Sequence, residues 1–385
     1  MNAVISYMFP LITLLVLCGL NYYLARRCFQ CVKFLAPNIP QLLFILIFIV
    51  LMLVMILGFI RSLLPIPTIF RNLLAQISAY SMGAFVYLLL FMVLADIVLV
   101  ICHLLKIFSM TAPVVRFVSG MAVMVLAVIT VVYGTYHARQ LKIVTYDVTV
   151  ENKTLEKDWN IVMISDLHLG AIGSEEYLEK IVNEINNLNP DLVCIAGDFF
   201  DSDYNAIQNP KKAMEVLKQL KTKYGIYVCL GNHDAGDTAL QMQQFLEQSN
   251  IQMLNDTYTI IQDELVLVGR LDSSPIGGYA GMTRKNVSEV LAGIDTNLPI
   301  MVMDHNPANI GEYSGEIDLI VSGHTHKGQI FPGNLITDAM YTVDHGYYQA
   351  NEDRPQVIVT SGVGTWGMPI RVGTDSEIVQ ITLHP

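Results

Sequence analysis

The first 146 residues alternate long apolar stretches with short polar connections. Four of these stretches carry at most one charged side chain each, and they lie at 1–25, 41–60, 77–102 and 117–136. A helix needs about 20 apolar residues to cross a hydrocarbon core of roughly 30 Å, so each stretch is long enough to span a membrane. The pattern therefore predicts an N-terminal region of four transmembrane helices over residues 1–136.

From residue 137 onward, short apolar runs alternate with segments of helical periodicity. Residues 137–150 are expected to form a linker and a first strand, at 143–150. Further strands are predicted at 160–165, 192–196, 226–230, 258–262, 265–268, 300–304, 319–322, 357–360 and 378–383. Helices are predicted at 175–188, 211–220 and 238–248. This alternation, followed by further strands, predicts a layered α/β domain over residues 151–385 with a mixed sheet system.

The two parts of the chain differ in net charge. Residues 1–146 hold nine Lys or Arg and one acid, and residues 147–385 hold 14 basic and 33 acidic residues. The net charges of +8 and −19 indicate different surroundings, with a membrane as the partner of the first part. The acidic part offers no basic surface, so we expect no nucleic-acid partner.

Positive charges also bear on which side of the membrane the C-terminal domain lies. The connections after the first and third predicted spans hold five Lys or Arg, and those after the second and fourth hold four. Cytoplasmic loops carry an excess of positive charge, so this difference of one favours the five-charge side as cytoplasmic. The C-terminal domain is then expected outside the cytoplasm, anchored in the plasma membrane.

Asp96 is the only acid within the predicted spans. A carboxylate is costly in a bilayer and marks a functional candidate. The alternative is a structural hydrogen bond to a Tyr or Arg of a neighbouring helix, which we favour because the spans hold no second acid for a proton relay. The C-x-x-C at Cys28–Cys31 lacks a second cysteine pair, so it indicates lipid-facing or palmitoylated thiols rather than a zinc site.

Polar residues with metal-ligating side chains follow several of the predicted strands. They occur in the segments Asp166-Leu167-His168, Gly197-Asp198, Gly231-Asn232-His233-Asp234, His305-Asn306 and Gly323-His324-Thr325-His326. Five of the seven histidines after residue 146 lie in these segments. Mixed nitrogen and oxygen ligands suit Mn, Fe or Zn better than Ca or Mg. The set therefore predicts a hydrolytic centre with two divalent metal ions.

Together these segments resemble the signature of the calcineurin-like metallophosphoesterases, which reads D-x-H, G-D, G-N-H-[DE], a lone H and G-H-x-H. All five parts occur here in that order, and the resemblance covers residues 145–385. The longer runs SDLHLG, HNP, SGHTHKGQI and SGVGTWGMPIR resemble a branch of membrane-linked phosphoesterases that includes transmembrane proteins with a metallophosphoesterase domain. The resemblance implies an α/β domain whose central β-sandwich is flanked by helices.

The resemblance also implies roles for individual residues. Asp198 would bridge two metal ions. The first ion would be held by Asp166, His168 and His326, and the second by Asn232, His305 and His324. His233 would not ligate but would protonate the leaving group or stabilise the transition state, and Asp234 would orient His233 and tune its pKa. Lys327 departs from this branch, which often has Gly there, and is either a phosphate contact or a surface charge.

The leading hypothesis is a membrane-bound metal-dependent phosphoesterase that cleaves a phosphodiester or a pyrophosphate. Four spans are more than an anchor needs, which favours a lipid-linked substrate. A non-catalytic, metal-stabilised binding module is the alternative, but it predicts the loss of His233 or Asp198, and both are present. A sensor or transporter that acts through Asp96 is a third hypothesis.

Several polar residues near the motifs have structural explanations that we favour. Asp201, Asp203 and Asp272 are interpreted as loop acids. Arg270 and Arg371 could contact a substrate phosphate, but we expect them to form ion pairs.

Overall fold

The computed structural model describes residues 2–109, 112–150 and 153–385 of the chain. The chain divides into two compact units, Met1–Tyr133 and Gly134–Pro385. The division falls inside the helix α4, so the last turn of α4 belongs to the second unit.

Long apolar helices make up the described part of unit 1. Their bounds are Asn2–Val32 for α1, Gln41–Phe59 for α2, Thr68–Leu104 for α3 and Pro113–His137 for α4, with the short helix η1 at Arg61–Leu63. Proline stands just before or at the start of α2, α3 and α4. A backbone N–H at these positions has no partner within the helix, so proline, which lacks that N–H, removes no helical hydrogen bond. By length and composition, α2, α3 and α4 can each cross a membrane.

Asp96 on α3 contacts α1 rather than forming an isolated charge. Its carboxylate accepts a hydrogen bond from the Tyr23 hydroxyl at 2.7 Å and pairs with Arg27 at 2.6 Å. Both partners lie on one face of α1, because residues four apart in a helix are neighbours. The favoured interpretation of Asp96, a hydrogen bond to a Tyr or Arg of a neighbouring helix, is therefore confirmed.

Unit 2 contains two six-stranded mixed sheets within its described residues. In spatial order, the first sheet consists of β1 (Leu141–Thr149), β12 (Ser376–His384), β2 (Trp159–Ile164), β3 (Leu192–Ala196), β4 (Ile226–Cys229) and β5 (Gln252–Met253). The second consists of β10 (Gly346–Tyr348), β11 (Gln356–Val359), β9 (Leu319–Ser322), β8 (Ile300–Met303), β7 (Leu265–Gly269) and β6 (Thr257–Ile261). Strands β2 to β5 are parallel to one another, and so are β7, β8, β9 and β11.

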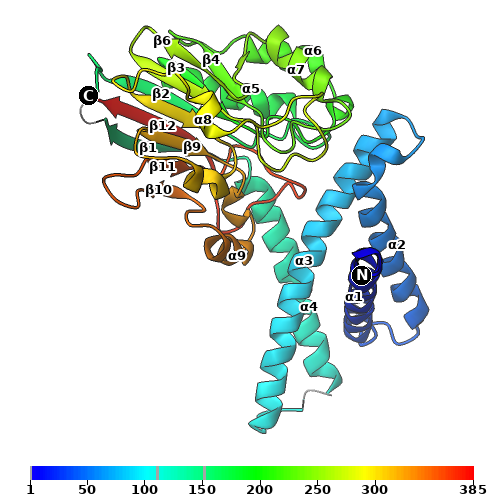
Figure 1. Ribbon diagram of the computed structural model, residues 1–385. Coiled ribbons are helices and arrows are strands. Elements are labelled where there is room, and N and C mark those ends of the chain that lie inside the picture. Colours follow the sequence, from blue (N-terminus) through cyan, green and yellow to red (C-terminus); the bar gives the residue numbers. More distant parts are fainter. Residues whose placement is uncertain (1, 110–111, 151–152) are drawn as a thin grey trace. The chain divides into compact units, whose positions relative to one another are not determined.

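The two sheets share a buried core, which accounts for the continuous apolar runs of their central strands. Ile161 and Cys194 of the first sheet pack in one cluster with Leu267 and Val321 of the second. The outer face of the first sheet is covered by α5 (Glu175–Asn187), α6 (Pro210–Leu217) and α7 (Ala239–Gln248), as Figure 1 shows. The predicted α/β domain with mixed, sandwich-like sheets and flanking helices is confirmed.

The structure also contains elements that the hydrophobic pattern did not predict. The short strands β5 and β10 and the helices α8 (Val287–Val290) and α9 (Gly333–Met340) were not expected. Helix α9 has no buried residue, so it lacks the apolar stripe facing a core from which a helix is usually recognised.

Candidate metal centre

The expected ligands lie at one edge of the sandwich. Asp166 and His168 follow β2, and Asp198 and Asn232 follow β3 and β4 of the same sheet. From the second sheet, His305 follows β8, whereas His324 and His326 follow β9. These strands are parallel within each sheet, so their carboxyl ends carry side chains to a common edge. Segments that are far apart in sequence thereby converge.

One group of donors consists of Asp166, His168 and His326, whose ligand atoms all lie within 4.8 Å of one another. The Nε2 atoms of His168 and His326 are 3.1 Å apart, and Asp166 Oδ1 lies 3.4 Å from His326 Nε2. Asp166 is held in place because its carboxylate accepts hydrogen bonds from Ser165 Oγ at 2.7 Å and from the backbone N–H of His324 at 3.1 Å.

A second group gathers around His305 and His324. His324 Nδ1 lies 2.9 Å from Asn232 Oδ1, and the ligand atoms of Asp198, His305 and His324 lie within 4.8 Å of one another. His305 Nδ1 donates to the backbone carbonyl of Ala196 at 2.7 Å, which turns its Nε2 atom toward the site.

Asp198 lies between the two groups. Its Oδ2 atom is 3.1 Å from His305 Nε2 and 3.8 Å from His168 Nε2. Its Oδ1 atom accepts a hydrogen bond from the backbone N–H of His233 at 2.8 Å. The carboxylate is therefore oriented so that one oxygen faces donors of both groups.

The motif glycines allow this close convergence. A Cβ atom at Gly323 would collide with Ser165 Oγ and Asp166 Oδ2, and one at Gly231 would collide with the backbone and side chain of Asp198. Any larger residue would displace a carboxylate. Glycine is therefore required at these two positions by the close approach of neighbouring atoms.

Burial and neighbouring charges shift the protonation of the donors. Burial lowers the pKa of His168 to about 3 and that of His324 to about 4, and it lowers the pKa of His326 well below its ordinary value. These three imidazoles are thus neutral at pH 7, as metal ligation requires. For Asp198, burial alone would raise the pKa, but the charge and hydrogen bond of His305 outweigh it and lower the pKa.

These features fit a pair of divalent cations. With metal–ligand bonds of about 2.0–2.2 Å, donors that share one ion lie roughly 3–4 Å apart, as the atoms of the first group do. Burial raises the pKa of Asp166 to about 6, and Asp198 and Asp166 hold the pKa of His305 well above its usual range despite its burial. The buried cluster therefore favours added positive charge. The donors are oxygen and nitrogen atoms only, which suits borderline cations.

His233 points into the same site, but its partner differs from the expected one. Its Nδ1 atom lies 2.6 Å from Ser202 Oγ. The carboxylate of Asp234 instead accepts hydrogen bonds from the backbone N–H groups of Phe200 and Gly231, both at 2.8 Å. Asp234 thus shapes the loops that carry His233, and Ser202 is the residue that orients the ring. The expectation that Asp234 orients His233 and tunes its pKa stays a prediction, with the loop backbone as the connection between the two residues.

Sequence patterns gave no signal for Ser202, since serine is common in loops. Asp201, interpreted as a loop acid, approaches the site because its Oδ1 atom lies 4.0 Å from His168 Nδ1. Asp203 behaves as a loop acid and accepts from the backbone N–H of Asn205 at 2.9 Å. Asp272 is buried and accepts from the backbone N–H of Ser274 at 2.7 Å.

The two arginines near the motifs have different partners. Arg270 pairs with Asp256 at 2.7 Å, so the expected ion pair is confirmed. Arg371 was also expected to form an ion pair, but it forms none with the acids that the structure describes. Its buried guanidinium donates to the backbone carbonyls of Ser361 at 2.6 Å and Gly364 at 2.7 Å, and thereby holds the loop after β11.

A cavity of about 470 Å³ opens over these residues. Its polar wall includes His168, Asp198, Asn232, His233, His324 and His326. Its apolar lining includes Ile336 and Met340 of α9 and Trp366 of the loop after β11. The Trp366 ring centroid lies 5.8 Å from that of His233. The site thus combines metal-ligating side chains with apolar ones, and the apolar part was not predicted.

Comparison with known proteins identifies the class to which this arrangement belongs. The family model for calcineurin-like phosphoesterase matches residues 160–328. An uncharacterized metallophosphoesterase of Campylobacter jejuni is 30% identical over 304 residues, covering 77% of this chain and 78% of that protein. The chain belongs to the calcineurin-like metallophosphoesterase family.

Two further relatives match shorter shares of their own length. An uncharacterized metallophosphoesterase of Helicobacter pylori is 31% identical over 237 residues, covering 60% of this chain. A Danio rerio transmembrane protein with a metallophosphoesterase domain is 32% identical over 275 residues, covering 68% of this chain. The chain spans 61% of the length of each of these two relatives.

Proposed function

We propose that this chain is a membrane-bound phosphohydrolase with a dinuclear metal centre, which cleaves a phosphodiester or a pyrophosphate. The observation that carries the proposal is the convergence of donors around Asp198, whose Oδ2 atom faces His168 on one side and His305 on the other. Divalent Mn, Fe or Zn, when bound there, would supply Lewis-acid activation of a phosphoryl group and of water. Family membership supports the same reaction class.

In this proposal two groups of side chains hold the metal ions, with Asp198 between them. One group is Asp166, His168 and His326, and the other is Asn232, His305 and His324. His233 is the proton donor to the leaving oxygen, because its Nδ1 atom is engaged by Ser202 and its ring lines the cavity.

Hydrolysis assays on the full-length chain test this proposal. We expect Mn- or Zn-dependent cleavage of a chromogenic phosphodiester, slower cleavage of the monoester, and no turnover after chelation. His233→Ala should retain metal and lose activity by about 100-fold or more. Full metal occupancy with no turnover on any phosphoester would instead favour the alternative, a non-catalytic metal-stabilised binding or sensor module.

We also propose a lipid-linked substrate, since the apolar wall of the cavity continues onto exposed surface. Leu335, Ile336 and Met340 of α9 are 58%, 59% and 71% exposed, and Trp366 is 51% exposed. The backbone of Trp366 is held by the side chain of Gln329, through bonds of 2.7 and 3.0 Å. The backbone that carries this large aromatic side chain is thus held beside the cavity, where a hydrocarbon chain could lie next to a phosphate.

A comparison of two substrates tests this part of the proposal. Replacing Trp366 and Met340 by serine should raise KM for an acyl-chain phosphodiester about tenfold or more, because apolar contact area is lost. KM for a small water-soluble diester should change little. Leu240→Ser, which alters another exposed apolar side chain outside the cavity lining, is the matched control. Equal effects on both substrates would contradict a hydrocarbon-binding role.

We further propose that α1 spans the membrane together with α2, α3 and α4, and that unit 2 lies outside the cytoplasm at the plasma membrane. The similarity to a transmembrane relative supports membrane anchoring, and the distribution of positive charge supports the sidedness. A C-terminal epitope tag should then be accessible on intact cells. Accessibility only after permeabilisation would contradict this orientation.

A further inference from the structure

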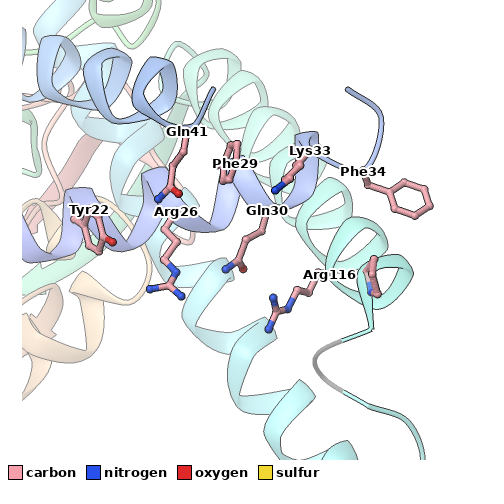
Figure 2. Close-up of a pocket in the computed structure, with 9 residues that line it drawn as sticks. Tyr22, Arg26, Phe29, Gln30, Lys33, Phe34, Gln41 and Arg116 are labelled. Carbon is pink, nitrogen blue, oxygen red and sulfur yellow. The ribbon is translucent and has the colours of Figure 1, made fainter. Parts of the chain in front are cut away.

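Unit 1 contains a cavity of about 710 Å³ at the C-terminal end of α1. Its polar lining comes from α1, the connection that follows it, and the first turns of α2 and α4, as Figure 2 shows. The side chains that carry the argument are Tyr22, Arg26, Gln30, Lys33, Gln41 and Arg116. Three of these are cations and three are neutral hydrogen-bonding groups, so the cavity has the composition of an anion site.

Among the described residues, no carboxylate lines this cavity. Asp96, the only acid among residues 1–146, is already engaged by Arg27 and by the Tyr23 hydroxyl. The neighbouring arginines of α1 therefore have different environments, because Arg27 meets a carboxylate of α3 while Arg26 faces the cavity. Concentrating like charge in one cavity is unfavourable unless an anion joins it.

The helical spacing of α1 places the polar groups of the cavity on one face. Tyr22, Arg26 and Gln30 are each four residues apart, so they lie one above another along the helix. Figure 2 shows Arg26 and Gln30 leaving α1 on the same side, with Arg116 of α4 beside the same cavity. An arginine from each of two helices can thus approach one phosphate, for which the guanidinium group is well shaped.

Close packing within unit 1 forms the walls of the cavity. A Cβ atom at Gly120 of α4 would lie 2.8 Å from Cys31 Cβ, so the glycine allows α1 and α4 to approach closely. The rings of Phe34 and Phe117 stack with centroids 4.8 Å apart. Lys33 Nζ lies 5.5 Å from the centroid of the Phe29 ring. The cationic groups therefore project from a packed framework.

We propose that this cavity binds the phosphate-bearing headgroup of an anionic membrane lipid. A lipid is favoured over free phosphate because apolar residues near the cavity are exposed, including Leu35 at 65%, Val114 at 56% and Val118 at 57%. Acyl chains could cover these residues while the headgroup meets Arg26 and Arg116. Basic pockets between membrane helices are known to hold such headgroups, and each cation near a membrane surface favours anionic lipid.

Lipid binding to the full-length chain, measured by native mass spectrometry in detergent, tests the proposal without any assay of hydrolysis. Phosphatidylglycerol should bind at least about tenfold more tightly than phosphatidylcholine. The double variant Arg26→Gln/Arg116→Gln should lose about tenfold or more of that affinity. Lys106→Gln removes a cation from the connection between α3 and α4 that does not line the cavity, and it should leave the affinity unchanged.

The variant Arg26→Lys/Arg116→Lys keeps the charge but not the guanidinium shape, so its affinity should lie between those of the wild-type chain and the glutamine variant, which separates loss of binding from loss of folding. Two results would overturn the proposal: equal affinity for both lipids, or the same loss in Lys106→Gln as in the double variant. Inorganic phosphate provides the third arm of the experiment. If it binds as tightly as phosphatidylglycerol and displaces it, the site is one for free phosphate and the lipid assignment is wrong.

Discussion

Left-handed backbone conformations mark the metal centre at the level of single residues. Asp166, His168, Asp198, His324 and His326 all have positive φ angles, between 48° and 71°. Such conformations cost free energy in residues other than glycine and persist where the surroundings enforce them. The sequence motif predicted which side chains would gather, because short apolar runs precede them. It could not predict the orienting contact of Ser202, because Ser202 is not part of the motif and serine is common in loops.

Ser202 offers a direct test of how His233 is positioned. Ser202→Ala removes the Oγ atom that lies 2.6 Å from His233 Nδ1, so the ring loses its orientation. We expect kcat for phosphodiester cleavage to fall about tenfold, while the bound metal content stays the same. Ser288→Ala, at an exposed position of α8, is the matched control. An unchanged kcat, or a loss of metal, would contradict the orienting role.

At the level of elements, the central strands were predictable and the elements around the cavity were not. Strands such as β3 are buried at every position, so they appear in sequence as uninterrupted apolar runs. Helix α9 has exposed apolar side chains and no buried ones. It is only eight residues long, so the sequence lacks the extended apolar periodicity from which a core-facing helix is predicted. Strand β12, which lies between β1 and β2, also contributes to the site. Its Glu377 accepts hydrogen bonds from Thr360 Oγ1 and the backbone N–H of Ser361, in the loop beside Asp166.

Glu377 predicts a pH dependence of stability. Burial alone would raise its pKa, but the hydrogen bond and charge of His345 and the bonds from Ser361 and Thr360 outweigh it, so the pKa is lowered. A lowered carboxyl pKa stabilises the fold fully above the unfolded-state value of 4.5. This contribution is lost progressively as pH falls from that value through the lower folded-state pKa. Glu377→Gln should therefore reduce the free energy of unfolding by about 1–3 kcal/mol at pH 7.

That difference should shrink at pH values below about 4.5. Denaturant titrations followed by tryptophan fluorescence can measure it, because both tryptophans, Trp159 and Trp366, lie in unit 2. Glu215→Gln, an exposed position on α6, should have little effect at either pH. Equal destabilisation by Glu377→Gln at neutral and acidic pH would show that shape rather than charge explains its contribution.

For the whole molecule, the contrast in composition between the two parts corresponds to two compact units. The apolar, basic part forms long helices, and the acidic part forms the sandwich with the metal-ligating residues. The predicted domain boundary rests on hydropathy, because membrane-spanning helices and water-exposed domains have different solvents. The cavity at the end of α1 could not be predicted, since it depends on which residues of α1 and α4 meet in space.

The metal content of the purified full-length chain tests the central claim most directly. After dialysis against Mn or Zn, elemental analysis should give about two ions per chain. Asp198→Ala should lose at least one ion, because the Asp198 carboxylate faces both groups of donors. Asp237→Ala, which removes an exposed acid, should retain both. A wild-type chain that binds no metal, or an Asp198→Ala variant that keeps both ions, would contradict a dinuclear centre bridged by Asp198.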